Sequence, residues 1–405
     1  MNYKLGDLFK FIRNGANIKQ GIPGGYPITR IETISKGEIN RNKMGYAGIE
    51  DITGYEKYIL QDGDILTSHI NSEIHLGKSA LYKKINDELI IHGMNLLCLR
   101  ADQNIVLPKY IIYLFQTLEF KKSLNKIIKK SVNQASFAVA DFKKLNVSIP
   151  SIGAQEKIIA ILEDCEVLIK KRQSQIAALD ELTQSLFLEM FGDPIYNTRN
   201  WIKVCFGDVI NVLTDYHANG SYQVLKNHVE LLDEENYALM IRTTDLEHQN
   251  YTEDVKYITE EAYNFLTKTQ VFGGEIIINK IGSAGKVYIM PNLNRPVSLG
   301  MNQFMIRVNS KANNRFIYYL LNTKAGQNLI QKRVQGAVTK SITKDAVRSI
   351  PIILPPIDLQ NEFDNNLEQI NSHKNLLQNS LQSIQELHQS LLQKAFKGEL
   401  FQEQI

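Results

Sequence analysis

The chain has 405 residues, of which 43% are hydrophobic, so it can bury roughly two or three cores and is not expected to be disordered or fibrous. Its 46 Lys and Arg residues nearly balance its 43 Asp and Glu residues, which leaves a formal net charge of +3. This balance excludes a strongly basic, histone-like binder. Any contact with nucleic acid must come from local patches of charge.

The three cysteines, Cys98, Cys165 and Cys205, stand far apart and form no Cys-x-x-Cys pair. This spacing argues against a disulfide scaffold or a structural zinc site and favours a reducing compartment. The N-terminus lacks a basic start followed by an apolar stretch, and apolar runs such as residues 158–162 are too short to span a bilayer. We therefore expect a cytoplasmic protein with no membrane partner.

The sequence repeats itself, with a second half that follows the pattern of the first. The distance between matching segments varies early in each half and is constant near its end, which is typical of variable loops that lead into a helix of fixed length. The matching segments are residues 5–8 and 206–209, 63–66 and 274–277, 149–155 and 354–360, and 185–191 and 390–396.

Each half opens with about 150 residues in which β-branched and aromatic runs are separated by Gly, Asn, Asp and Pro, a pattern that predicts an α+β module. The segment Gly274 to Lys286 predicts a hairpin, and Thr29-Arg30 and Ile241-Arg242 predict strand ends. Helices are expected at residues 108–130 and 314–335. Pro150 and Pro355 end the two modules.

A long stretch free of Gly and Pro follows each proline, from about Gln155 to Phe191 and from about Gln360 to Lys397. Apolar residues recur there at steps of three and four, which predicts two helices of roughly 55 Å that pair as an antiparallel coiled coil. The alternative is two separate amphipathic helices, each lying on its own module. The residues expected to pack in the pair are Ile158, Leu162, Cys165, Ile169, Ile176, Leu179, Leu186, Phe363, Leu367, Ile370, Leu377, Leu381, Ile384 and Leu391.

Catalytic motifs are missing from the sequence. Gly77-Lys78-Ser79 resembles the end of a phosphate-binding loop, but Ser72 stands where the first glycine is needed. Pro355-Pro356 lacks the acidic or amide residue and the aromatic residue that an adenine methyltransferase loop uses. The eight histidines form no H-E-x-x-H helix. We expect a protein without catalytic or metal-binding residues and without a cofactor of its own.

Polar loops at matching places in the two halves are the candidate DNA contacts. Amides, hydroxyls, Arg and Lys read base edges, and Lys, Arg and backbone amides bind phosphates. One such loop alone is better explained as solvated surface, but recurrence favours two modules of one fold that read different sequences. The candidates in the first half are Arg30, Ser68, Asn71, Lys78, Lys130, Asn133, Gln134 and Ser136. Those in the second half are Arg242, Lys280, Ser283, Lys286, Arg333, Gln335, Thr339, Lys340 and Ser341.

Residues 149–156, 354–360 and 389–400 resemble the corresponding segments of type I restriction-modification specificity subunits. The resemblance implies two target-recognition domains, each reading one half-site of a bipartite double-stranded DNA target, and two conserved helices that set the spacer between the half-sites. The implied divisions are target-recognition domain 1 at 1–154, spacer helix 1 at 155–192, target-recognition domain 2 at 193–358, spacer helix 2 at 359–398 and a tail at 399–405.

The resemblance also implies partners. These are two modification subunits, which hold S-adenosylmethionine and methylate adenine, and two restriction subunits, which are ATP-dependent translocases and endonucleases that use ATP and magnesium. Exposed polar residues of the first helix, such as Lys170, Lys171, Gln173 and Gln175, are expected to face these partners. The second half departs from the pattern with Asn361 where the first half has Glu156, which puts local contacts in doubt.

Three other functions fit parts of the sequence. The chain can be the specificity module of another type of restriction-methylation enzyme, which neighbouring genes would reveal. It can be an enzyme with an unrecognised active site, which binding of S-adenosylmethionine by the isolated chain would indicate. It can also be a coiled-coil scaffold that binds no DNA, and such a protein would show no salt-dependent binding to duplex.

Overall fold

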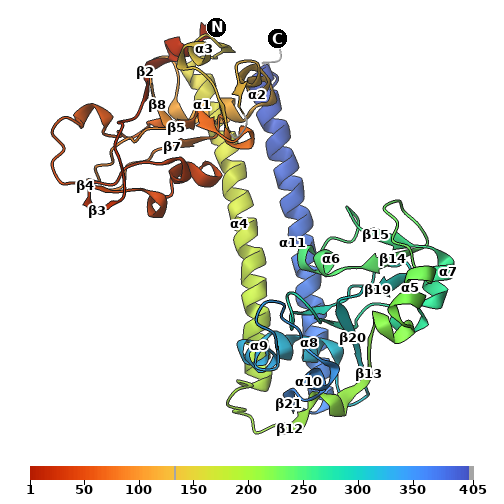
Figure 1. The fold of residues 1–405 in the computed structure, drawn as a ribbon. Helices are drawn as coiled ribbons and strands as arrows, with labels where there is room; N and C mark the ends of the chain where they lie inside the picture. Colours follow the sequence, from red (N-terminus) through yellow and green to blue (C-terminus); the bar gives the residue numbers. More distant parts are fainter. Residues whose placement is uncertain (132–133, 401–405) are drawn as a thin grey trace. The chain divides into compact units, whose positions relative to one another are not determined.

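The computed structural model describes residues 1–131 and 134–400. It contains two compact units, unit 1 (Met1–Ser174 with Gln378–Ile405) and unit 2 (Gln175–Leu377). Figure 1 shows the strands of unit 1 in red to orange and those of unit 2 in green to blue. The units end within the two long helices, and the division at residues 154, 192, 358 and 398 stays a prediction.

Unit 1 is built on an antiparallel sheet with the strand order β2-β8-β5-β7. Neighbouring residues point to opposite faces of a strand. Ile65 and Leu97 therefore face a core that includes α1 and α2, whereas Leu66 and Cys98 face a second core with Tyr82. The elements of unit 1 are β1 (Asn2–Lys4), β2 (Phe9–Asn14), β3 (Ile22–Gly25), β4 (Ala47–Ile49), β5 (Ile65–Ser68), β6 (Ile70–Asn71), β7 (Ser79–Leu81), β8 (Leu96–Ala101), α1 (Pro108–Gln116), α2 (Leu118–Asn125), β9 (Lys129–Lys130), β10 (Ala135–Ser136), α3 (Val139–Lys143) and β11 (Asn146–Ser148).

Unit 2 repeats this framework, with an antiparallel sheet in the order β13-β20-β17-β18. It adds a second sheet, β15-β14-β19-β16, whose core contains Leu239, Val271 and Val297. The elements of unit 2 are β12 (Ile202–Cys205), β13 (Ile210–Asp215), α5 (Tyr222–His228), β14 (Ala238–Ile241), α6 (Thr243–His248), β15 (Lys256–Ile258), α7 (Glu260–Phe265), β16 (Gln270–Val271), β17 (Ile276–Asn279), β18 (Val287–Ile289), β19 (Val297–Leu299), β20 (Gln303–Val308), α8 (Asn314–Asn322), α9 (Lys324–Gln331), α10 (Lys344–Arg348) and β21 (Pro351–Leu354).

The first and last strands of each module pair with each other. Strand β1 runs antiparallel to β11, with Tyr3 opposite Val147, and β12 runs antiparallel to β21, with Lys203 opposite Ile353. The chain therefore enters and leaves each module at one place, immediately before a long helix.

The helical stretches predicted at residues 108–130 and 314–335 each contain two short helices, α1 and α2 or α8 and α9. The predicted ends of these stretches were wrong, because α2 ends at Asn125 and α9 at Gln331. The breaks fall at Thr117 and Thr323, whose hydroxyls accept hydrogen bonds from the amides of Phe120 and Gly326 and so cap the second helix of each pair. The predicted strand end at Arg30 was also wrong, since this residue precedes a 3-10 helix at Ile31–Gly37.

The long helices α4 (Ile152–Phe191) and α11 (Ile357–Lys397) pack together. In unit 1, Ile158 and Leu162 near the start of α4 share a core with Leu392 and Ala395 near the end of α11. The helices therefore run antiparallel, as predicted, and each begins three residues before its expected start.

In unit 2 the end of α4 meets the start of α11 through aromatic rings. Phe187 and Phe191 lie 5.5 and 5.4 Å, centroid to centroid, from Phe363, in edge-to-face geometry. Of the residues expected to pack in the helix pair, Ile158, Leu162, Cys165, Phe363 and Leu367 are buried. The half-buried ones are Ile169, Ile176, Leu179, Leu186, Ile370, Leu377, Leu381, Ile384 and Leu391.

The glutamine of the repeated phrase fastens each long helix to its module. Gln155 accepts a hydrogen bond from the Leu107 amide at 2.8 Å and donates to the carbonyls of Ile105 and Pro150. Leu107 is the residue before α1, so the side chain joins the starts of two helices. The same three bonds recur at Gln360 in unit 2, with Asn313, Lys311 and Pro355 as partners.

Candidate nucleic-acid interface

In unit 1 the two predicted loops lie side by side. Strand β6 pairs with β10, with Asn71 opposite Ala135, and β10 pairs in turn with β9. An ion pair of 2.8 Å between Lys130 and Glu73 also joins them. Residues 68–78 therefore form one surface with residues 129–131 and 134–136.

The candidate side chains of unit 1 differ in exposure. Ser68 is 1% exposed, and its hydroxyl accepts a hydrogen bond of 3.3 Å from the side-chain Nδ2 of Asn71. Lys78, Lys130 and Gln134 are exposed, and Ser136 is half-buried. Lys78 Nζ lies 2.7 Å from His75 Nδ1. Asn133, the remaining candidate of these loops, lies outside the described residues.

Arg30 lies near this surface but is not bonded to its loops in the described contacts. Its guanidinium donates to the Gln20 side chain at 2.8 Å. The 3-10 helix that follows it contributes Glu32 and Ile34 to a cavity of about 550 Å³ that Ser68, Asn71 and Lys78 also line. Arg30 therefore flanks the candidate surface of unit 1.

Unit 2 brings its two predicted loops together in the same way. Ser341 forms bridges with both Gln335 and Ile281. The Gly282 amide donates to the Lys340 carbonyl at 3.1 Å, and the Ile342 amide donates to the Lys280 carbonyl at 3.0 Å. Thr339 and Lys340 are exposed, and Val338, at the tip of the second loop, is 98% exposed. Residues 280–286 and 335–341 thus form one surface.

Two glycines of these loops serve packing. Gly77 and Gly285 have φ values of +71° and +85°, and an added Cβ would lie 2.4 Å from Leu124 Cδ2 or 2.5 Å from Ile330 Cγ2. They let the loops pack closely on α2 and α9. Gly282, with a φ of +82°, has no atom beyond its chain neighbours within 4 Å of the same point, so this glycine is not required by packing.

Most cationic candidates of unit 2 are held by carboxylates. Lys280 pairs with Asp215 at 2.9 Å, and Lys286 pairs with Glu247 at 3.0 Å. The Ser283 hydroxyl accepts a hydrogen bond of 2.7 Å from the side-chain Nδ2 of Asn279. Each ion pair fixes the direction of a long side chain at the edge of the loop surface.

Arg333 is not brought into this surface by its described bonds. Its guanidinium donates to the Leu329 carbonyl at 2.8 Å and to the hydroxyl and carbonyl of Ser349, both at 2.9 Å. It therefore ties the end of α9 to the end of α10.

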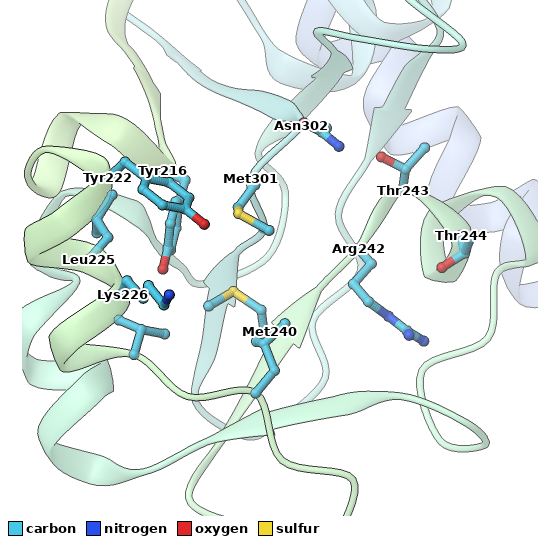
Figure 2. Close-up of a pocket in the computed structure, with 13 residues that line it drawn as sticks. Tyr216, Tyr222, Leu225, Lys226, Met240, Arg242, Thr243, Thr244, Met301 and Asn302 are labelled. Carbon is cyan, nitrogen blue, oxygen red and sulfur yellow. The ribbon is translucent and has the colours of Figure 1, made fainter.

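Arg242, which follows strand β14 as predicted, lines a pocket of about 520 Å³ shown in Figure 2. Its guanidinium binds the buried Asp245 carboxylate, which raises the pKa of Arg242. In the view of Figure 2, Met301 lies between the Tyr216 ring and the Arg242 side chain. The pocket adjoins the loops because the Lys280 amide donates to the carbonyl of Asn302, another lining residue, at 2.8 Å.

The sequence-based prediction missed Asp215, Tyr216 and Lys344 at this surface. Lys344 donates to Asp215 at 2.7 Å. Asp215 is the last residue of β13, and Tyr216 begins the 3-10 helix that follows. Only the position of Lys344, three residues after the candidate Ser341, was a signal for it. Strand β13 carried no loop pattern that pointed to Asp215.

Within residues 1–131 and 134–400, no group of three or more His, Cys, Asp or Glu side chains is arranged to hold a metal ion. Over the same residues, no helix is both long and apolar enough to cross a membrane.

Comparison with known proteins places this fold. The profile of the family described as "Type I restriction modification DNA specificity domain" matches residues 1–178 and 198–388. The chain is 30% identical over 424 residues to the "Putative type I restriction enzyme MjaX specificity subunit" of Methanocaldococcus jannaschii, covering 98% of this chain and 92% of the relative. It is 20% identical to the "Type I restriction enzyme MjaVIII specificity subunit" of the same organism, covering 98% and 92%.

Solved structures share the fold. A chain from a structure described as "Structural basis underlying complex assembly and conformational transition of the type I R-M system" aligns with a TM-score of 0.61 at 15% identity, covering 99% of this chain and 98% of that one. The type I restriction-modification S subunit from M. genitalium aligns with a TM-score of 0.56 at 14% identity, covering 98% and 96%. With two matches to the family profile and a relative aligned over nearly its whole length, the chain belongs to the family of type I restriction-modification specificity subunits.

Proposed function

We propose that this chain is the non-catalytic DNA-recognition subunit of a type I restriction-modification complex in the cytoplasm. Each unit reads one half-site of a bipartite duplex target, and partner subunits methylate adenine and cleave DNA. The observation that carries the proposal is the recurrence of one arrangement: two polar loops adjoin at the edge of the same four-stranded antiparallel framework in both units.

The two loop surfaces share a backbone arrangement but differ in chemistry, which supports two different half-sites. Unit 1 exposes Gln134, Lys78 and Lys130 on this surface, whereas unit 2 exposes Thr339, Lys340 and the apolar side chain of Val338. Amides suit the edge of adenine, and methyl groups suit the methyl of thymine. Different side chains on one framework are expected to read different bases.

The cofactors of the complex belong to the partners in this proposal. Two modification subunits hold S-adenosylmethionine, and two restriction subunits use ATP and magnesium, while this chain binds none of these. Lys170, Lys171, Gln173 and Gln175 are exposed on α4, and this face of the helix is proposed to contact the partners. Charge reversal at Lys170 and Lys171 that leaves complex assembly unchanged would contradict this placement.

The proposal is tested by co-expressing the chain with its neighbouring methyltransferase subunit in a methylation-free host and mapping methylated adenines across the genome. A split motif with a fixed spacer is expected. No methylation by a soluble complex, together with no salt-dependent duplex binding, would favour the scaffold alternative. Binding of S-adenosylmethionine by the isolated chain would favour an enzyme.

A second experiment tests whether each unit reads its half-site independently. Exchanging residues 335–341 for a Gly-Ser loop is expected to degrade one half-site of the mapped motif and to leave the other intact. The matched control replaces Ser310, an exposed residue of unit 2 outside both candidate loops, by glycine and should leave both half-sites unchanged. Loss of both half-sites in the loop variant, with the complex still assembled, would contradict independent reading.

The helices are proposed to set the spacer. Inserting the same number of helical turns into α4 and α11 is expected to lengthen the spacer of the methylated motif while both half-sites stay the same. A change in a half-site without a change in the spacer would contradict this role.

A further inference from the structure

One acidic side chain in unit 2 holds two lysines. Asp215, at the end of β13, accepts a hydrogen bond of 2.9 Å from Lys280 through Oδ2 and one of 2.7 Å from Lys344 through Oδ1. The Asp215 side chain is 9% exposed, whereas those of Lys280 and Lys344 are 26% and 32% exposed. The carboxylate is thus nearly buried, whereas the two lysine side chains that bind it are partly exposed to solvent.

The cluster carries an excess positive charge. Burial alone would raise the pKa of Asp215, but the hydrogen bonds from Lys344 and Lys280 outweigh it and lower the pKa, so the carboxyl is ionised at neutral pH. Both ammonium groups lie over the Phe304 ring, at 5.6 and 5.9 Å from its centroid. Each ammonium has three N–H donors, and the carboxylate uses one from each.

The cluster borders the proposed reading loops. Lys280 is the first residue after β17, and its backbone binds Ile342 and Asn302. Lys344 begins α10, three residues after the loop of residues 335–341 closes. The two ammonium groups therefore come from the two chain segments that meet at the surface.

Unit 1 has uncharged side chains at the corresponding positions. Asp215 is opposite Phe304, which is opposite Ile278, and Lys280 lies two residues beyond.

In unit 1, Asn14 is opposite Leu97, which is opposite Thr67, and His69 lies two residues beyond. Val139 corresponds to Lys344, because it is the first residue of α3 just as Lys344 is the first residue of α10. His69 is 6% exposed, and its burial lowers its pKa, which keeps it neutral at pH 7. The charged cluster is therefore a feature of unit 2 and is not required by the shared framework.

We propose that Asp215 is a positioning residue that holds Lys280 and Lys344 so that their free N–H groups seat one phosphate of the DNA backbone. This inference rests on the proposed function and adds to it a fixed contact between unit 2 and the DNA backbone. Ammonium groups suit this role because they act as point charges with rotatable donors, which match a phosphate better than a base edge. This contact with phosphate fixes where the unit 2 loops lie along the DNA backbone, and it carries no sequence information itself.

The test uses the complex with the methyltransferase subunit and a labelled duplex that contains the mapped target, with the Kd measured over a series of KCl concentrations. Lys280→Ala and Lys344→Ala are each expected to weaken binding roughly tenfold, and the double variant to flatten the slope of log Kd against log [KCl] by about 1. The methylated motif should not change. Matched controls are Val139→Ala at the corresponding position of unit 1 and Lys324→Ala on the exposed surface of unit 2.

Asp215→Asn separates positioning from a structural role. Without the carboxylate, both ammonium groups are free to find phosphates, so the salt slope should steepen and affinity for non-target duplex should rise, with Asp215→Glu restoring the original values. A merely structural Asp215 would lower the melting temperature and leave the slope unchanged.

If the wild-type complex methylates a split motif and the double lysine variant keeps the wild-type salt slope and affinity, the proposed phosphate contact is overturned and the proposed function stands. A wild-type complex without a split motif would overturn the proposed function.

Discussion

Replacing Gln360 by leucine is expected to lower the free energy of unfolding of unit 2 by roughly 3 kcal/mol. Gln360 is 0% exposed, accepts from the Asn313 amide at 2.9 Å and donates to the carbonyls of Pro355 and Lys311 at 2.8 and 3.3 Å. Leucine fills a similar volume but satisfies none of these three backbone groups. Each lost bond costs about 1 kcal/mol, and a fully stranded group costs more.

Thermal unfolding followed by circular dichroism or calorimetry measures this effect. For a unit of this size, roughly 3 kcal/mol corresponds to a fall of about 6–12 °C in Tm. The matched control is Gln369→Leu, an exposed glutamine on the same helix, for which a change within about 0.5 kcal/mol is expected. If both variants melt alike, the three bonds do not hold α11 to its module and the reasoning is refuted.

Three further outcomes are expected. Burial lowers the pKa of His92 to about 4, below its value in the unfolded chain. Unit 1 should therefore lose stability as the pH falls from about 6.5 towards 4, by roughly 2 kcal/mol at pH 5. Chemical denaturation at pH 7.5 and pH 5 should show a smaller loss of stability for the His92→Gln variant than for the wild type. Lys286→Ala should weaken duplex binding on all sequences and flatten the salt slope by about 1, and a loss confined to one base pair would contradict a phosphate contact. Val338→Ala should leave Tm unchanged because the side chain is 98% exposed, while relaxing one position of the methylated motif by about 1 to 3 kcal/mol; an unchanged motif would remove Val338 from base reading.

The parts of the fold that could be predicted from sequence are those with a local period or a repeat. The long helices were found because apolar residues recur through 40 and 41 residues without a breaker. The breaks at Thr117 and Thr323 were missed because threonine also occurs inside helices, and its capping role depends on the backbone turning there.

The candidate loops were located because their polar composition recurs in both halves, but the state of their side chains depends on distant partners. Asp215 lies 65 and 129 residues from the lysines that it binds, and no local pattern connects them. No local pattern shows that Gly77 and Gly285 serve packing, yet a Cβ there would collide with Leu124 and Ile330. Such contacts depend on tertiary packing.

The pairing of β1 with β11 and of β12 with β21 makes each module a cassette with adjacent ends. A cassette of this kind can be exchanged for another of the same framework by two recombination junctions, one before its first strand and one after its last. The glutamine that follows each cassette forms hydrogen bonds with backbone atoms, so it requires no particular side chain from the module that replaces the original one. Recombination of the gene at two places can therefore give the protein a new target half-site, while both long helices stay unchanged.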